Sequence, residues 1–178
     1  MRRFLLGLCL VVAAAAPGNT ARADPLRFPP AGKPAFQVTL LKGWHSKADT
    51  RGGLLLVPPP QSQHAMVYIA VLTDETLRGA DARKVAGAVA KVAGFELNDK
   101  QDPARVSDPT GARIYRGTAF YGSMPPVRGL ARKAKIVIFP LSPNTWAQIW
   151  VITQPGIGAV EIAALEQVLD GIALVNEP

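Results

Sequence analysis

The nine residues from Ala65 to Thr73 read Ala-Met-Val-Tyr-Ile-Ala-Val-Leu-Thr, so they are apolar at both odd and even positions. Successive side chains of a β-strand point to opposite faces of its sheet, and a strand with this pattern must therefore be covered on both faces. Such a strand belongs inside a sheet that has a layer of structure on each side. The chain is therefore predicted to fold as a layered sandwich, with 65–73 as a central strand.

The rest of the chain supplies the other strands of this sheet. Alternating and β-branched runs bounded by glycine and proline predict strands over 35–41, 52–57, 104–107, 112–121, 129–141 and 145–153. The first two are expected to pair as a hairpin, and a turn is expected at 122–126. Connections of hairpin length make neighbouring strands antiparallel. The expected fold class is α+β, with a mostly antiparallel sheet covered by helices in an α/β/α sandwich.

Two segments carry apolar residues at helical spacing. The first covers 81–94, begins at Asp81 and ends at Gly94, and is expected to turn inward Ala82, Val85, Ala86, Val89 and Val92. The second covers 158–174 and is expected to turn Ile162, Leu165, Leu169 and Ile172 inward and Glu161, Glu166, Gln167 and Asp170 outward. These two helices are the predicted covers of the sheet.

This arrangement resembles the PsbP-like family, which is named for the extrinsic photosystem protein. The resemblance covers residues 35–174 and is carried by Lys42-Gly43-Trp44, Leu72-Thr73, the helix from Asp81, the strands around Ser142-Pro143-Asn144, and the closing Leu165-Glu166-Gln167-Val168-Leu169-Asp170-Gly171-Ile172. It implies the α/β/α sandwich that the family shares with a Ran-binding nuclear import factor and with small bacterial envelope proteins. It also implies a role in binding or assembly, and no catalytic signature comes with it.

The first 23 residues have the three parts of a secretory signal peptide. Arg2 and Arg3 are followed by a 13-residue apolar run over 4–16, and Ala21-Arg22-Ala23 matches the small-x-small cleavage site. The run is too short to cross a bilayer, which needs about 20 residues. We therefore expect a periplasmic or secreted protein, cut near Ala23. Residues 24–34 hold four prolines and are expected to form an extended arm before a single domain over 35–178.

Removal of this segment limits the chemistry of the exported chain. Cys9 is the only cysteine, so the exported chain can form no disulfide, thiolate nucleophile or cysteine metal site. Its net charge falls from +7 to +4 because three arginines leave, which is too mild to imply nucleic-acid binding and allows at most weak contact with a membrane surface. His45 and His64 lack the spacing of a metal motif, so no metal and no cofactor are expected.

No arrangement typical of a catalytic site occurs in the sequence. The serines do not stand in a Gly-x-Ser-x-Gly elbow, and neither histidine has an orienting acid at a recognisable spacing. We therefore expect no enzymatic activity and name no catalytic residue. The alternative is a periplasmic hydrolase or lyase acting on an envelope component, with a site assembled from His45 or His64 and loop acids.

Three side chains of the strand 145–153 form the predicted ligand-binding site. Trp146, Gln148 and Trp150 alternate along the strand and therefore share one face of it. Under a helix the two indoles would be core residues. Where a pocket opens beside them, two rings and an amide suit a sugar, a lipid tail or an aromatic ligand.

The densest basic run is Arg128, Arg132, Lys133 and Lys135. The two arginines have one parity on a strand and the two lysines the other, so the four cannot form one flat patch on a straight strand. One interpretation is a charged sheet edge that discourages aggregation. The other is a surface for an acidic partner or a membrane, and Arg128, Arg132 and Lys133 are its predicted partner-binding residues.

The signal, the compact fold and the lack of a catalytic arrangement predict one class of function. We expect an exported, non-enzymatic binding or accessory protein of the cell envelope. It would act through another envelope protein or a small-molecule ligand.

The signal segment can be tested directly. When the full chain is expressed with its export route intact, the recovered protein is expected to start at Asp24, because Ala21 and Ala23 supply the small side chains of the cleavage site. Intact-mass measurement and N-terminal sequencing check this start. The Ala23→Arg variant is expected to accumulate uncut, and an unchanged start in that variant would contradict the assignment.

Overall fold

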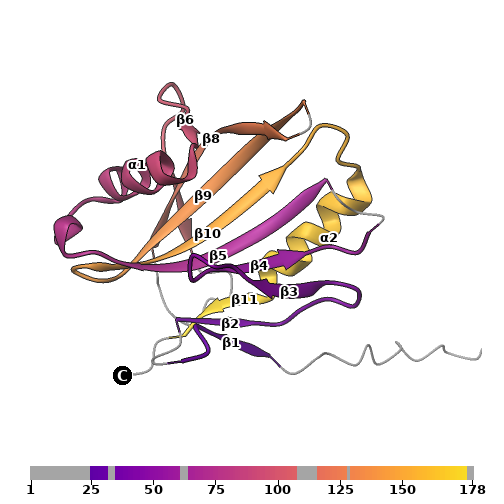
Figure 1. The fold of residues 1–178 in the computed structure, drawn as a ribbon, viewed down its shortest axis with the longest axis horizontal. Coiled ribbons are helices and arrows are strands. Elements are labelled where there is room, and N and C mark those ends of the chain that lie inside the picture. The colour runs from indigo at the N-terminus through magenta and orange to yellow at the C-terminus, as the bar shows by residue number, and fades with distance from the viewer. Residues whose placement is uncertain (1–24, 32–34, 61–63, 108–115, 128, 176–178) are drawn as a thin grey trace, which may run out of the picture.

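Figure 1 shows the fold in a computed structural model, which describes residues 25–31, 35–60, 64–107, 116–127 and 129–175. The expected signal segment 1–23, with its cleavage site, and Arg128 lie outside the described residues. The described chain forms a large antiparallel sheet, a small antiparallel sheet and two α-helices. The expected α+β sandwich with a mostly antiparallel sheet is confirmed.

The large sheet has the strand order β3-β4-β5-β10-β9-β8-β6, and β7 pairs with β8 beside this path. Its neighbouring strands are antiparallel. As the sequence predicts, β5 lies inside the sheet, between β4 and β10. The strands are β3 His45–Ala48, β4 Leu54–Val57, β5 Ala65–Thr73, β6 Glu96–Leu97, β7 Ala104–Ser107, β8 Arg116–Val127, β9 Leu130–Ser142 and β10 Thr145–Thr153.

The two faces of β5 are covered by different layers. On one face, Val67 and Ile69 are fully buried in the core that includes Leu165 and Val168 of α2 (Ala159–Asp170). On the other face, Tyr68 belongs to the core under α1 (Ala82–Ala93), whose buried side chains are Val85, Ala86 and Ala90. Full burial of one aliphatic side chain stabilises a fold by about 1.5–3 kcal/mol, so both layers hold the sheet.

A small sheet completes the layer beside α2. Its strand order is β1-β2-β11, with β1 Leu26–Phe28, β2 Phe36–Val38 and β11 Ile172–Leu174. Phe36, Val38 and Ile172 are buried in the same core as the inward side chains of α2. The small sheet therefore joins the first and last described strands of the chain.

The small sheet changes three expectations about the two ends of the chain. The expected arm 24–34 includes β1, and Phe28 is buried because this strand pairs with β2. The segment 35–41 does not form a hairpin with 52–57, since β2 pairs with β1 and β11 while β3 pairs with β4. The final helix ends at Asp170, and Ile172 is buried in β11 rather than on a helix face.

Two further expectations differ within the large sheet and its helices. The strand β8 does not turn at 122–126 but runs through Pro125 and Pro126 to Val127. A register shift between Met124 and Val127 interrupts the ladder there, so two residues without an amide hydrogen are tolerated. In the helices, Val92 and Ile162 were expected to point inward but are exposed. Ala90 of α1, which was not among the expected inward residues, is buried.

The junction between α2 and β11 predicts a position-specific effect of one added methyl group. A Cβ on Gly171 would overlap the carbonyl oxygen of Thr39, so Gly171→Ala is expected to lower the free energy of unfolding by about 1–3 kcal/mol. Gly87, in the middle of α1, faces open space, and Gly87→Ala is expected to raise it by about 0.5–1 kcal/mol. Urea unfolding followed by circular dichroism measures both. Equal effects of the two substitutions would contradict the close approach at Gly171.

Candidate functional site

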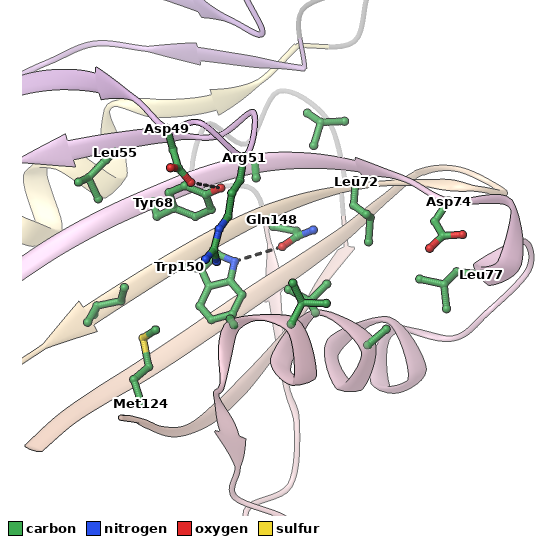
Figure 2. A pocket seen from close by; sticks show the side chains of 17 residues that line it. Asp49, Arg51, Leu55, Tyr68, Leu72, Asp74, Leu77, Met124, Gln148 and Trp150 are labelled. Atoms are coloured by element: carbon green, nitrogen blue, oxygen red, sulfur yellow. Dashed lines mark hydrogen bonds between the residues drawn. The ribbon is translucent and has the colours of Figure 1, made fainter. Parts of the chain in front are cut away.

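A cavity of about 390 Å³ lies between α1 and the sheet. The helix packs over β9, β8 and β6, and the faces of β4, β5 and β10 extend beyond it. Most of the lining is apolar, as the close view in Figure 2 shows. Its larger apolar side chains are Leu55, Leu72, Leu77, Val89, Val92, Met124, Trp150 and Ile152.

The strand β10 brings the predicted ligand-binding residues to this face of the sheet. Gln148 and Trp150 line the cavity, whereas Trp146 is buried in the core under α1 and does not line it. Gln148 is only 4% exposed and is the one buried polar residue among the described residues. Alternation along β10 therefore predicts that the three side chains share one face of the sheet. The position of α1 determines that Gln148 and Trp150 reach the cavity and that Trp146 does not.

A hydrogen bond fixes the orientation of the Gln148 amide. The indole Nε1–H of Trp150 donates to Gln148 Oε1 at 3.1 Å (Figure 2). Because an indole nitrogen only donates, the amide oxygen must face Trp150 and the NH₂ group must point away from it. Among the described residues no hydrogen-bond partner of this NH₂ group is found. No buried side-chain polar atom of the described residues lacks a partner, so this NH₂ group is an oriented donor that faces the open space of the cavity.

Three further polar residues line the cavity: Asp49 and Arg51 from the turn between β3 and β4, and Tyr68 from β5. Tyr68 donates a hydrogen bond from its hydroxyl to Asp49 Oδ2 at 3.3 Å. Burial raises the pKa of Tyr68, and the charge and hydrogen bond of Asp49 raise it further. The tyrosine ring lies directly against the backbone at Gly53, where a Cβ would overlap it. The phenol is therefore held in its protonated, donating form.

Arg51 supplies the positive charge at the cavity. It is exposed, and Figure 2 shows its side chain extending from the β3–β4 turn in front of the cavity. Within the described part of the chain, no carboxylate lies within ion-pair distance of its guanidinium. The nearby carboxylate of Asp49 accepts a hydrogen bond from Tyr68 instead.

The sequence does not indicate Asp49, Arg51 or Tyr68 as members of a site. They are far from Gln148 along the chain and come together only through the pairing of β4 with β5 and of β5 with β10. Asp74 closes the other end of the cavity as the N-cap of a short 3-10 helix, Glu75–Leu77. Two hydrogen bonds from Thr76 lower the pKa of Asp74, so its carboxylate is already occupied.

The sequence also gives no sign of the acid that holds His64. Both carboxylate oxygens of Glu161 lie 3.1 Å from His64 Nδ1, and Glu161 Oε2 accepts a hydrogen bond from the Gly158 amide at 3.1 Å. Glu161 was expected to point outward, and this expectation is wrong. The pair joins the entrance of β5 to the first turn of α2. No hydroxyl or thiol is a hydrogen-bond partner of His64 among the described residues.

His45 begins β3 and His64 stands before β5, so both lie at the same end of the large sheet with β4 between their strands. In the described ranges no three His, Cys, Asp or Glu side chains are grouped to hold a metal ion. None of the described helices is long and apolar enough to cross a membrane.

The predicted partner-binding residues Arg132 and Lys133 lie at the start of β9. The Arg132 guanidinium donates two hydrogen bonds to the carbonyl oxygen of Pro125, at 2.8 and 2.6 Å. Lys133 is exposed and, as its neighbour in a strand, points to the opposite face. From Lys133 onward β9 lies between β10 and β8, so only its first residues, 130–132, lie at an edge.

Comparison with known proteins identifies the fold alone. No protein-family model and no curated protein sequence matches the chain. A crystal structure from Bacteroides thetaiotaomicron VPI-5482 superposes with a TM-score of 0.51 at 15% identity, over 80% of this chain and 46% of that one. This chain thus spans about half the length of that protein, with which it shares its α/β fold.

Two smaller proteins are similar over most of their length. LpqN, which is involved in cell envelope biogenesis of Mycobacterium tuberculosis, superposes with a TM-score of 0.48 at 15% identity, over 85% of this chain and 90% of LpqN. A point mutant of the protein Mog1 superposes with a TM-score of 0.46 at 8% identity, over 80% of this chain and 92% of Mog1.

The His64–Glu161 pair predicts how stability depends on pH. The Gly158 amide, and then His64, lower the pKa of Glu161 in the folded chain. A lowered pKa stabilises the fold above the ordinary glutamate pKa of about 4.3, and this stabilisation is lost as the pH falls through the lower folded-state value. Glu161→Gln is therefore expected to reduce the free energy of unfolding at pH 6, and the difference from the unsubstituted chain is expected to shrink as the pH is lowered.

Urea unfolding between pH 3 and pH 7 measures this difference. Glu166→Gln is the matched control, because Glu166 is exposed on the same helix. A loss of the same size at every pH in Glu161→Gln would contradict an ionic contribution from the pair.

Proposed function

We propose that the chain is an exported, non-enzymatic binding protein of the cell envelope, of the PsbP-like kind, and that it holds a small amphiphile in the cavity between α1 and the sheet. The amphiphile would have one hydrocarbon chain and an anionic head group such as a carboxylate. Export to the periplasm is the expectation that the N-terminal 23 residues support.

The observation that carries this proposal is the unpaired NH₂ group of Gln148 in an apolar cavity. Among the described residues no buried side-chain nitrogen or oxygen lacks a partner, so this NH₂ group is open to the space of the cavity and can donate to whatever fills it. The bond from Trp150 keeps the amide from rotating to find another partner. A ligand with a carbonyl or carboxylate oxygen would satisfy this donor.

The shape and lining of the cavity support a hydrocarbon chain as the rest of the ligand. A volume of about 390 Å³ lies within the range of small-molecule sites, roughly 300–1,000 Å³. The lining of Leu72, Val89, Met124 and Ile152 favours CH₂ groups, each of which contributes about 0.8 kcal/mol when it is buried. Methionine also adapts to different chain lengths because its side chain is unbranched.

The charge beside the cavity supports an anionic head group. The guanidinium of Arg51 has no carboxylate partner among the described residues, while Asp49 is engaged by Tyr68. A charge-assisted hydrogen bond to a carboxylate is stronger than one between neutral groups. Arg51 is therefore proposed to favour ligands with an anionic head group. Gln148 is proposed to donate a hydrogen bond to the ligand inside the cavity.

Filling the cavity tests the proposal. Titration calorimetry of the exported chain with decanoate is expected to give saturable binding. Ala88→Phe places a ring in the cavity and is expected to weaken binding at least tenfold, whereas Ala163→Phe, exposed on α2, is expected to leave it unchanged. Equal affinities of the two variants, or no saturable binding by the unsubstituted chain, would overturn the proposed site.

The head group is tested on the same protein. Arg51→Gln is expected to weaken the binding of decanoate several-fold and to leave the binding of 1-decanol unchanged, because the alcohol carries no charge. Since Arg51 is exposed, this substitution leaves the core intact. A parallel loss for both ligands would show that Arg51 does not select the anion.

A further inference from the structure

One end of the molecule gathers exposed aliphatic side chains. Val127 and Leu130, on the two sides of the β8–β9 turn, are 45% and 49% exposed, and Val160 and Ile162, at the start of α2, are 84% and 43% exposed. Figure 1 shows this turn and the connection from β10 to α2 at the same end of the molecule. Exposed aliphatic side chains that cluster in this way mark an interaction surface.

The β8–β9 turn projects beyond the rest of the sheet. The last residue of β10, Thr153, pairs with Lys133 of β9. Residues 130–132 therefore have only β8 as a neighbouring strand, and Val127 pairs with Leu130 at the tip. The tip thus extends past β10 as a narrow two-stranded ribbon.

A second hollow lies between this end of the molecule and the cavity beside α1. It has a volume of about 580 Å³ and lies between the tip residues Val127 and Leu130 and the end of β4 at Pro58. Leu55 lines both this hollow and the cavity. Met66 of the hollow is also the direct cross-strand partner of Ile152 of the cavity. The cavity and the exposed end therefore share an apolar border.

Positive charge lies just behind the exposed tip. Arg132 is two residues after Leu130, about 7 Å along the strand, and its guanidinium is fixed on the Pro125 carbonyl. Lys133 follows on the opposite face. In the described part of the chain neither has a carboxylate within ion-pair distance. Glu161, in the first turn of α2 at the same end, already contacts His64 and accepts a hydrogen bond from the Gly158 amide.

We propose that this end of the molecule docks on an anionic lipid membrane. Val127 and Leu130 enter the boundary between head groups and acyl chains, and Arg132 and Lys133 contact the lipid phosphates. Interfacial segments bury their apolar side chains about 5–10 Å deep, which matches the distance between Leu130 and Arg132 along β9. The ribbon carries aliphatic side chains at its tip and a cation on each face just behind them, an arrangement that complements an apolar layer beneath a layer of phosphates. This docking does not depend on a ligand in the cavity.

Sedimentation with lipid vesicles tests the docking. The exported chain is mixed with vesicles of phosphatidylglycerol and phosphatidylcholine, or of phosphatidylcholine alone. The partition coefficient on the anionic vesicles is expected to be at least fivefold higher, and to fall when the salt is raised from about 0.05 M to about 0.5 M, because salt screens the phosphates. Equal binding to both vesicles, or no binding to either, would overturn the proposal.

Matched variants assign the effect to this end. Val127→Ser combined with Leu130→Ser is expected to reduce the partition coefficient at least fivefold, and Leu26→Ser, at an exposed leucine on β1, is expected to leave it unchanged. Lys133→Glu is expected to reduce it as well, in contrast to Lys91→Glu on α1. Circular dichroism verifies that each variant is folded. If the double variant binds as well as Leu26→Ser, the tip does not enter the membrane and the proposal is wrong.

Discussion

The cavity follows from a mismatch between one short helix and a wide sheet whose faces must both be buried. The twelve residues of α1 span about 18 Å, and a helix is about 10–12 Å wide with its side chains. The nine residues of β10 alone span about 30 Å, and neighbouring strands lie about 4.8 Å apart. The helix therefore lies over β9, β8 and β6, and only part of the face formed by β5 and β10 is packed beneath it. On the other face, α2 and the small sheet both contribute side chains to one core.

The elements that the sequence predicts well are those with local signals. Asp81 caps α1 by accepting from the amide of Lys84, and Gly94 ends it with a positive φ, so both ends follow from nearby residues. The pattern of β5 likewise places it inside the sheet. The errors are at places where pairing over a long distance decides. The apolar Ile172 continues the helical spacing of α2, and only β2, far away in the sequence, makes it part of a strand.

The residues of the candidate site also fall into two groups, those that a local pattern predicts and those that only long-range pairing brings together. Alternation along β10 is enough to place Gln148 and Trp150 on one face, and the hydrogen bond between them joins residues two apart. Arg51 and Tyr68 reach them through two successive strand pairings, which no short motif encodes. The same holds for His64 and Glu161, which are 97 residues apart. Their sequence neighbours are ordinary loop and helix residues, so only the assembled fold makes them partners.

The small sheet also affects the order in which the chain can fold. Its middle strand, β2, comes near the start of the chain and pairs with β11, which comes near the end. Contacts between residues so far apart cost more chain entropy to form and slow folding. Until 172–174 have been synthesised, Phe36 and Val38 lack a partner strand on one side. The small sheet therefore acquires its last strand only when synthesis is almost complete.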